Sequence, residues 1–356
     1  MWSILKREVK NYMKIPLFWM GIIIIIFMLF QNVKPYLDIH YLAEGETIVN
    51  DYPTTVHYGD VYEGYVPTGE AQRRKLWEER IGEILISEFE MDDAGAQAIL
   101  DEMKTMDIME ACAYLDRYGF CNAYYEYVNT AYLKATPEEI NAFIAEKLEN
   151  RTFSYYFSRK FADFAGLFMG FYATVLLSVL FLQDTRRNTY ELLHTKPVSA
   201  GEYLLGKVGG GFAACLIVLA VLNLTFYILC LVSAGNSGLE VRLRDFLLAT
   251  AFYILPNMLM VVSVYSLISL VLKNPLPGVP LLLLYIVYSN MGGRNAEGIY
   301  GYYGRPLAIM VRFPGTFFDT APPPMILLNQ SFLIIAAIGI IILSMQIWKS
   351  PANKCQ

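Results

Sequence analysis

The sequence has 356 residues, of which 55% are hydrophobic and only 17% charged, and its net charge is −5. Its mean hydropathy is +0.38. Soluble domains usually contain about a quarter charged residues, so this composition excludes an ordinary soluble protein, and the negative charge argues against a nucleic-acid partner. Residues 38–150 are rich in charge, whereas most of the rest is nearly charge-free. The composition therefore predicts a membrane protein that carries one solvated insert.

Residues 1–15 have the pattern of an amphipathic helix, with apolar residues at helical spacing and basic residues between them. Such a helix is expected at the inner membrane interface, where its aromatic rings lie at headgroup level and its cations face anionic lipid. A frayed cytosolic tail is the alternative. The apolar positions are Trp2, Leu5, Val9, Tyr12 and Met13, and the basic ones are Lys6, Arg7, Lys10 and Lys14.

Six apolar stretches are long enough, or nearly so, to cross a bilayer as helices, which requires about 20 residues. The first is too long for a signal peptide and is not followed by a small-residue cleavage site. The fourth contains Pro256, where we expect a kink, and the fifth is short and begins with two prolines, so a re-entrant or broken helix is open there. The stretches are residues 16–34, 161–182, 208–232, 246–272, 276–289 and 326–348.

Lysine and arginine residues near the span ends predict the orientation. In a six-span arrangement, the basic residues of the N-terminal segment, the loop after span two, position 273 and the C-terminal tail fall on one side. That side is expected to be cytoplasmic, although the opposite loops also carry several arginines. The sequence therefore predicts a multi-pass protein of the bacterial cytoplasmic membrane with both termini in the cytoplasm.

The insert at residues 35–158 is predicted to be a mostly helical extracytoplasmic domain between the first and second spans, and residues 159–356 the remaining membrane part. The last helix of the insert has the clearest start, with Thr136 as N-cap, Pro137 at the first helical position and Glu139 closing a capping box. The fold class is therefore an all-α integral membrane protein with six transmembrane helices. Within the insert, helical patterns cover residues 71–91, 94–103, 108–118, 122–133 and 137–149.

The insert carries little sign of catalysis. His40 and His57 lack a histidine or cysteine partner at metal-ligand spacing, and the carboxylates are predicted on water-exposed helix faces. Cys112 and Cys121 lie on either side of Gly119, so a disulfide between them is open if the compartment is oxidising. A binding or gating role stays open for this domain.

The segment between spans two and three, residues 183–207, has the most specific pattern in the chain. Its second part, from Gly201 to Lys207, matches the first seven positions of a phosphate-binding P-loop, but Val208 stands where a serine or threonine must coordinate Mg²⁺. No strand precedes this match, and a membrane helix follows it. We therefore predict that this chain does not hydrolyse ATP.

The whole segment instead resembles the inner loop of type-2 ABC exporter permeases, between their second and third spans. His194 stands where that family usually has a small residue, and Ala200 and Gly201 replace a common basic residue, so the sequence departs from the family pattern at these positions. The resemblance extends to the N-terminal helix and the six-span layout; only a subset of the family carries an insert after span one. The matching positions are Asp184, Arg186, Arg187, Asn188, Thr189, Glu191, Leu192, Leu193, Thr195, Lys196, Pro197, Val198, Ser199, Tyr203, Gly206 and Lys207.

The resemblance implies that residues 184–197 form a coupling helix that docks on a separate ATPase. It also implies two copies of the ATPase and a second permease chain, identical or a sister. The ATPase copies would bind ATP and Mg²⁺, and this chain would itself bind no cofactor. The outer loop 291–326 would be either a short helical lid or a plain loop. The residues expected to contact the ATPase are Asp184, Arg186, Arg187, Thr189, Glu191, Leu192, Leu193 and Lys196.

The sequence thus favours a non-catalytic permease subunit of an ATP-driven exporter for an amphipathic substrate, such as a peptide, a lipid-linked molecule or a drug. Asp163, near the outer end of span two, is the one charged residue predicted inside a span. Because an ion-coupled carrier usually needs charged groups within its spans, that class of transporter is disfavoured. The alternative is a membrane sensor or immunity protein whose external domain binds an antimicrobial peptide. A third hypothesis, an intramembrane enzyme, is disfavoured because the sequence shows no catalytic grouping of His, Cys or carboxylate residues.

Overall fold

The computed structural model describes residues 1–43, 45, 46, 48, 59–185, 199–294, 300, 301 and 304–349. The chain forms two compact units, one from Met1–His40 with Leu148–Gln356 and the other from Tyr41–Lys147. Helices dominate both units, and the described residues contain only two small two-stranded sheets. The predicted all-α membrane fold is therefore confirmed.

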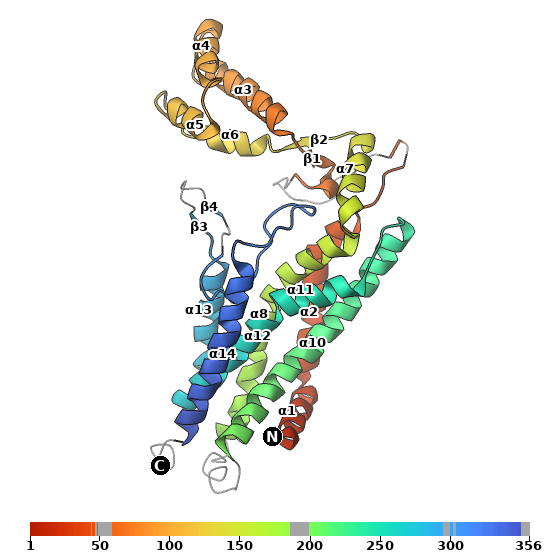
Figure 1. Ribbon diagram of the computed structural model, residues 1–356, viewed down its shortest axis with the longest axis vertical. Coiled ribbons are helices and arrows are strands. Elements are labelled where there is room, and N and C mark those ends of the chain that lie inside the picture. Colours follow the sequence, from red (N-terminus) through yellow and green to blue (C-terminus); the bar gives the residue numbers. More distant parts are fainter. Residues whose placement is uncertain are drawn as a thin grey trace. The chain divides into compact units, whose positions relative to one another are not determined.

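The first unit contains the long apolar helices (Figure 1). Five of its helical segments are long and apolar enough to span a membrane, and one further apolar helix, α13, is shorter. With 13 residues, α13 is about 20 Å long, which agrees with the expectation of a short fifth segment. The helices are α1 (Trp2–Lys14), α2 (Pro16–Leu37), α8 (Phe153–Thr185), α10 (Ala200–Asn236), α11 (Leu243–Tyr253), α12 (Leu255–Val271), α13 (Gly278–Asn290) and α14 (Ile326–Lys349).

Local chemistry explains where these helices begin and break. The fourth predicted span is divided at Ile254, two residues before Pro256, because proline lacks an N–H donor and its ring clashes with the preceding turn. Helix α8 begins eight residues before the predicted start at residue 161 because its first turn is packed: the ring of Phe153 lies 5.1 Å from that of Phe317. The predicted kink is confirmed, and α8 extends further toward the N-terminus than the predicted second span.

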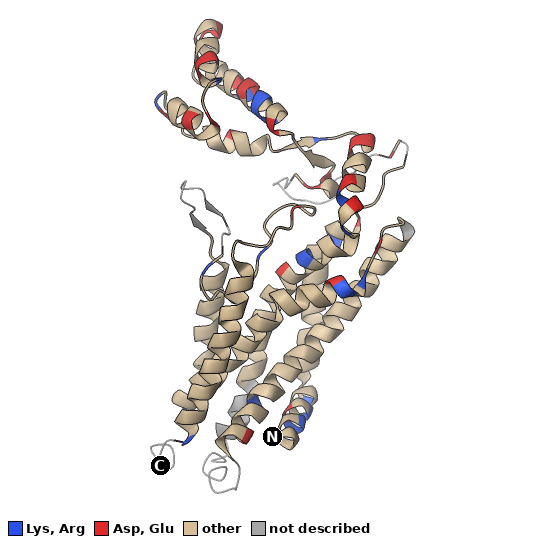
Figure 2. Cartoon of the chain, in the orientation of Figure 1, with Lys and Arg blue, Asp and Glu red and all other residues tan. Residues whose placement is uncertain are grey.

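Charge is distributed as a bilayer requires. Figure 2 shows that α2, α10 and α14 are free of charge over most of their length. In α2 the side chains of Ile22, Ile25 and Leu29 are buried against the bundle, whereas Ile23 and Phe27 are exposed. A helix that is apolar on its exposed face as well as its buried face is suited to lipid, not water.

The second unit is mostly helical, as predicted, with one correction. The helix predicted over residues 122–133 ends at Asn129, and Tyr132–Lys134 instead forms a strand that pairs antiparallel with Tyr65–Pro67. The capping box of the last helix is confirmed, since Thr136 Oγ1 accepts from the Glu139 backbone N–H at 3.3 Å. The elements are η1 (Val61–Glu63), β1 (Tyr65–Pro67), α3 (Glu70–Ser87), α4 (Asp93–Met103), α5 (Ile108–Asp116), α6 (Ala123–Asn129), β2 (Tyr132–Lys134) and α7 (Pro137–Asn150).

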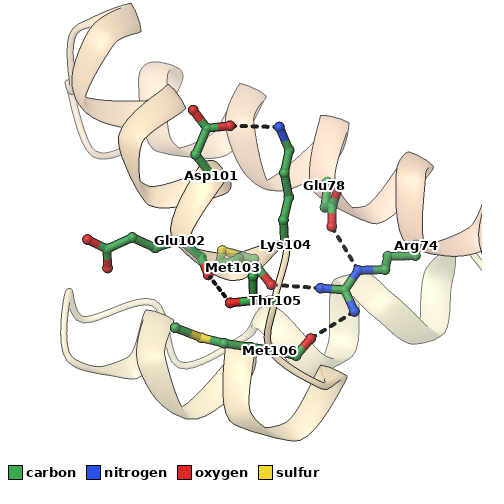
Figure 3. Close-up of polar contacts among 8 residues, drawn as sticks. All are labelled: Arg74, Glu78, Asp101, Glu102, Met103, Lys104, Thr105 and Met106. Atoms are coloured by element: carbon green, nitrogen blue, oxygen red, sulfur yellow. Dashed lines mark hydrogen bonds and ion pairs between the residues drawn. The ribbon is translucent and has the colours of Figure 1, made fainter.

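Helices α3 to α6 enclose a small core around Trp77, whose indole N–H donates to the backbone oxygen of Ala123 at 2.8 Å. Arg74 of α3 contacts Glu78 of the same helix and the chain at the end of α4 (Figure 3). Its guanidinium pairs with Glu78 at 2.9 Å and donates to the backbone oxygens of Met103 at 2.7 Å and Met106 at 2.8 Å. The arginine therefore binds two carbonyl groups at and just after the end of α4, where a helix leaves carbonyl oxygens without intrahelical donors.

We expect Arg74→Ala to reduce the stability of the α3–α6 region by about 2 kcal/mol, because hydrogen bonds from a charged group contribute about 1.5–3 kcal/mol. The adjacent Lys75 is 77% exposed, and its Nζ lies 3.8 Å from Oε1 of Glu79, a long and solvent-screened contact. Lys75→Ala should therefore cost less than about 1 kcal/mol. Amide hydrogen exchange of α3–α5 in the full chain measures both values. Equal losses for the two variants would contradict the role given to Arg74.

Cys112 and Cys121 are both free thiols in the structure. The Cys112 side chain packs against the α3–α6 core, and this burial raises its pKa to about 11. Cys121 is exposed, with its Sγ 3.7 Å from the backbone oxygen of Gly119. A high pKa leaves little thiolate for exchange at neutral pH, so the disulfide stays a prediction that depends on the compartment.

Candidate functional site

The predicted coupling helix joins the end of α8 to the start of α10. Asp184 lies in the last turn of α8, which ends at Thr185, and α10 begins at Ala200. The two neighbouring helices that flank this segment are thus both described, and they fix where it leaves and rejoins the membrane unit. The other predicted contact residues lie outside the described residues: Arg186, Arg187, Thr189, Glu191, Leu192, Leu193 and Lys196.

A capping box defines the start of α10. Ser199 Oγ accepts from the backbone N–H of Glu202 at 3.2 Å, and the Glu202 carboxylate accepts from the backbone N–H of Ser199 at 3.3 Å. This reciprocal pair satisfies donors that a helix N-terminus otherwise leaves open. The Ser-x-x-Glu spacing in the sequence is a signal for this helix start. Helix α10 begins at Ala200, eight residues before residue 208, where the third span was predicted to begin.

Helix α1 docks on this first part of α10 through a buried ion pair. The Nζ of Lys207 lies 2.9 Å from Oε1 of Glu8, and the two side chains are only 3% and 1% exposed. The predicted amphipathic helix is confirmed as a helix, but its packed face includes an acid that sequence reasoning passed over. Its position was a signal, because Glu8 lies one turn from both Leu5 and Tyr12, on the apolar face.

Glycines of α10 let the two helices approach closely. A Cβ atom added at Gly206 would lie 2.7 Å from the side chain of Ile4, and one added at Gly210 would lie 2.5 Å from Cβ of Glu8. Small residues at such crossings bring backbones together and increase van der Waals packing in a membrane. The glycine positions and the ion pair together hold α1 against α10.

The same end of α10 also contacts the last turn of α14. The rings of Tyr203 and Trp348 are stacked, with centroids 4.3 Å apart and an interplanar angle of 24°. The first two turns of α10 therefore contact α1 through Lys207 and α14 through Tyr203. This makes the base of α10 the point where three helices of the membrane unit meet, directly after the predicted coupling segment.

A second polar cluster lies at the start of α8. Arg312 pairs with Asp163, and its guanidinium also donates to the Asn290 side chain at 2.6 Å. Lys160 donates to the backbone oxygen of Phe313 at 2.9 Å, and Arg159 to that of Thr320 at 2.7 Å. Three charged residues of α8 thus fasten the loop before α14 to the helix bundle.

These contacts describe residues 304–325 of the outer loop 291–326, of which residues 295–299, 302 and 303 lie outside the described residues. Residues 304–325 contain no helix, so they do not form the short helical lid that was one alternative. They are not a plain exposed loop either, because Ile309, Phe313 and Phe317 are almost fully buried. The loop is irregular in backbone and packed like a core segment.

The interior of the membrane unit is polar in a few places but uncharged. Thr250 of α11 donates to the Asn223 side chain of α10 at 2.9 Å, and Ser263 donates back to Leu259 of its own helix at 2.8 Å. Such bonds hold helices together or satisfy hydroxyls locally. Among the described residues of this unit, the buried charged side chains are those of Glu8 in the middle of α1 and of Lys160, Asp163 and Lys207 in about the first three turns of α8 and α10.

Comparison with known proteins identifies the family. The model of a family described as ABC-2 family transporter protein matches residues 2–303, which is well over half of the chain. No curated protein and no solved structure gives a match. The matched range covers the N-terminal helix, the insert, and the helices on either side of the segment 184–197. The chain therefore belongs to the ABC-2 transporter family and is a multi-pass membrane permease subunit of an ABC transporter, which associates with ABC ATPase partners.

Proposed function

We propose that this permease subunit exports an amphipathic substrate across a bacterial cytoplasmic membrane, powered by two ATPase subunits that dock on residues 184–197. The observation that carries the proposal is the sixteen-position match in the segment between α8 and α10. In this arrangement both termini are cytoplasmic and the insert is extracytoplasmic. ATP and Mg²⁺ are bound by the ATPase partners and not by this chain, and a second permease chain, identical or a sister, completes the pathway.

The packing at the base of α10 supports a mechanical route from the ATPase to the spans. A push on residues 184–197 acts on the end of α8 and on the capped start of α10. Because α10 is tied to α1 by Glu8 and Lys207 and touches α14 through Tyr203 and Trp348, these helices would move together. Rigid-body displacement of packed helices is a common way to convert a local event into a global one.

The amphipathic nature of the substrate is inferred from the uncharged interior. A transported ion or strongly charged solute needs charged or coordinating groups along its path, and the buried charges of the described membrane unit lie in α1 and in about the first three turns of α8 and α10. A molecule with a large apolar part has no such requirement. Peptides, lipid-linked molecules and hydrophobic drugs all fit this description.

We expect at least tenfold less ATPase to co-purify with the variant Arg187→Ala/Glu191→Ala than with the wild type. The double substitution removes two charge-assisted contacts to the partner. The matched control is His194→Ala in the same segment, at a position that departs from the family pattern; it should retain ATPase at the normal level. Quantifying the ATPase that co-purifies with each permease measures the effect. Full retention by the double variant would count against docking at this segment.

A further inference from the structure

A cavity of about 370 Å³ lies where α14 begins. Its walls come from residues 304–310, from residues 323–325 and from the first two turns of α14. This size falls in the range of ligand pockets, about 300–1,000 Å³. The cavity is separate from the base of α10, because it lies at the other end of α14 from Trp348.

The cavity is mostly apolar, and part of its lining is exposed at the surface of the membrane unit. Ala308, Met310 and Ile326 line its inner side, and the lining residues Leu328 and Phe332 are 46% and 53% exposed. Helix α14 has 24 residues, most of them apolar. Its first two turns would therefore lie near one edge of the hydrocarbon core. A group that enters this cavity from its surroundings is therefore apolar.

One cation stands among these apolar walls. The Arg305 guanidinium is fixed in place: Nε donates to the backbone oxygen of Met291 at 3.1 Å, Nη2 donates to that of Gly292 at 2.8 Å, and the guanidinium lies 5.3 Å from the ring centroid of Tyr288. These partners are neutral, and among the described residues no carboxylate pairs with Arg305. Within that part of the chain its positive charge faces no negative partner, and it favours an anionic group at the lining.

The cavity is also held in shape by its loop. Leu307, beside the lining residue Ala308, has a φ of 57°, and Met325, which lines the cavity, has a φ of 59°. Large apolar side chains rarely adopt this left-handed conformation. Asn329 donates to the backbone oxygen of Ala308 at 3.0 Å, which ties the loop to α14 and keeps the cavity preformed.

We propose that this cavity binds one acyl chain of an anionic phospholipid from the leaflet at which α14 begins, with the lipid phosphate on Arg305. The apolar walls select a chain, the exposed part of the lining admits it from the bilayer, and the arginine selects an anionic headgroup over a zwitterionic one. Binding needs neither ATP nor the ATPase, so the proposal can fail while the transport function stands.

The test titrates the purified full-length chain with phosphatidylglycerol or phosphatidylcholine and counts retained lipids by native mass spectrometry. The wild type should retain one phosphatidylglycerol at about tenfold lower concentration than phosphatidylcholine, in line with a charge-assisted contact. Arg305→Gln should lose this preference, whereas Arg305→Lys, which keeps the charge, should keep it. The matched control Arg242→Gln, at an exposed arginine paired with Glu240, should behave as the wild type.

A second pair of variants tests the cavity itself. Leu328→Trp fills it, whereas Leu327→Trp adds the same ring one residue earlier, at an exposed position outside the lining. The first should reduce retention of both lipids at least tenfold and the second should not. A wild type without headgroup preference would overturn the proposal, as would equal binding by the two tryptophan variants. Loss of preference in both the Lys and Gln variants of Arg305 would also overturn it, because the guanidinium would then act only on the loop.

Discussion

Replacing Lys207 by methionine should release α1 from α10. In the native chain Glu8 and Lys207 are 1% and 3% exposed and lie 2.9 Å apart. Removing the cation leaves the buried carboxylate without its lysine, and breaking a buried pair in this way costs about 3–5 kcal/mol. Amide hydrogen exchange of residues 2–14 in the full chain measures the release, which should appear as at least a hundredfold faster exchange.

Two further variants make this result specific. Lys10→Met removes an exposed cation from the same helix and should leave exchange of α1 unchanged. The double variant Glu8→Met/Lys207→Met replaces the pair with apolar side chains, a change that is often neutral or stabilising, so protection of α1 should return. Exchange in the double variant as fast as in Lys207→Met would show that the pair is not what holds α1.

Replacing Arg312 by methionine should detach the loop of residues 304–325 from α8. The Asp163 side chain is 4% exposed and pairs with Arg312, so the variant leaves a buried acid without this partner, at a cost of about 3 kcal/mol. Exchange of the backbone amides of residues 308–313, with thermal unfolding of the full chain, measures the loss.

Arg312→Met/Asp163→Asn is the control for this prediction, because it removes the negative charge together with the positive one. We expect it to recover most of the lost protection, since an amide is far less costly to bury than a carboxylate. If the double variant were as unprotected as the single one, the loss would come from the Asn290 contact or from packing, not from the ion pair.

Much of the membrane unit follows from the sequence because its signals are local. Runs of apolar residues place the spans, Pro256 divides the fourth of them, and the spacing of the N-terminal apolar residues predicts α1. In the insert, Thr136 and Glu139 mark the start of α7 directly. Each of these features depends on residues that are close together in the sequence.

The features that sequence reasoning missed depend on contacts between distant residues. Glu8 and Lys207 become a pair only after α1 docks on α10, so neither residue alone predicts it. The loop 291–326 is rich in Gly, Tyr and Pro and has no period, yet its residues 304–325 pack because Lys160 and Arg312 join them to α8. Likewise, Tyr132–Lys134 became a strand through pairing with β1, which outweighed its helical pattern.

The most direct test of the account places a photocrosslinking phenylalanine analogue at Tyr190, inside the predicted coupling helix, in the assembled transporter. The matched control carries it at Tyr125, an exposed tyrosine of the insert. We predict a crosslink from position 190 to a Walker-motif ATPase and none from position 125. A crosslink to the ATPase from position 125, or none from position 190 in an assembly that contains the ATPase, would contradict the account.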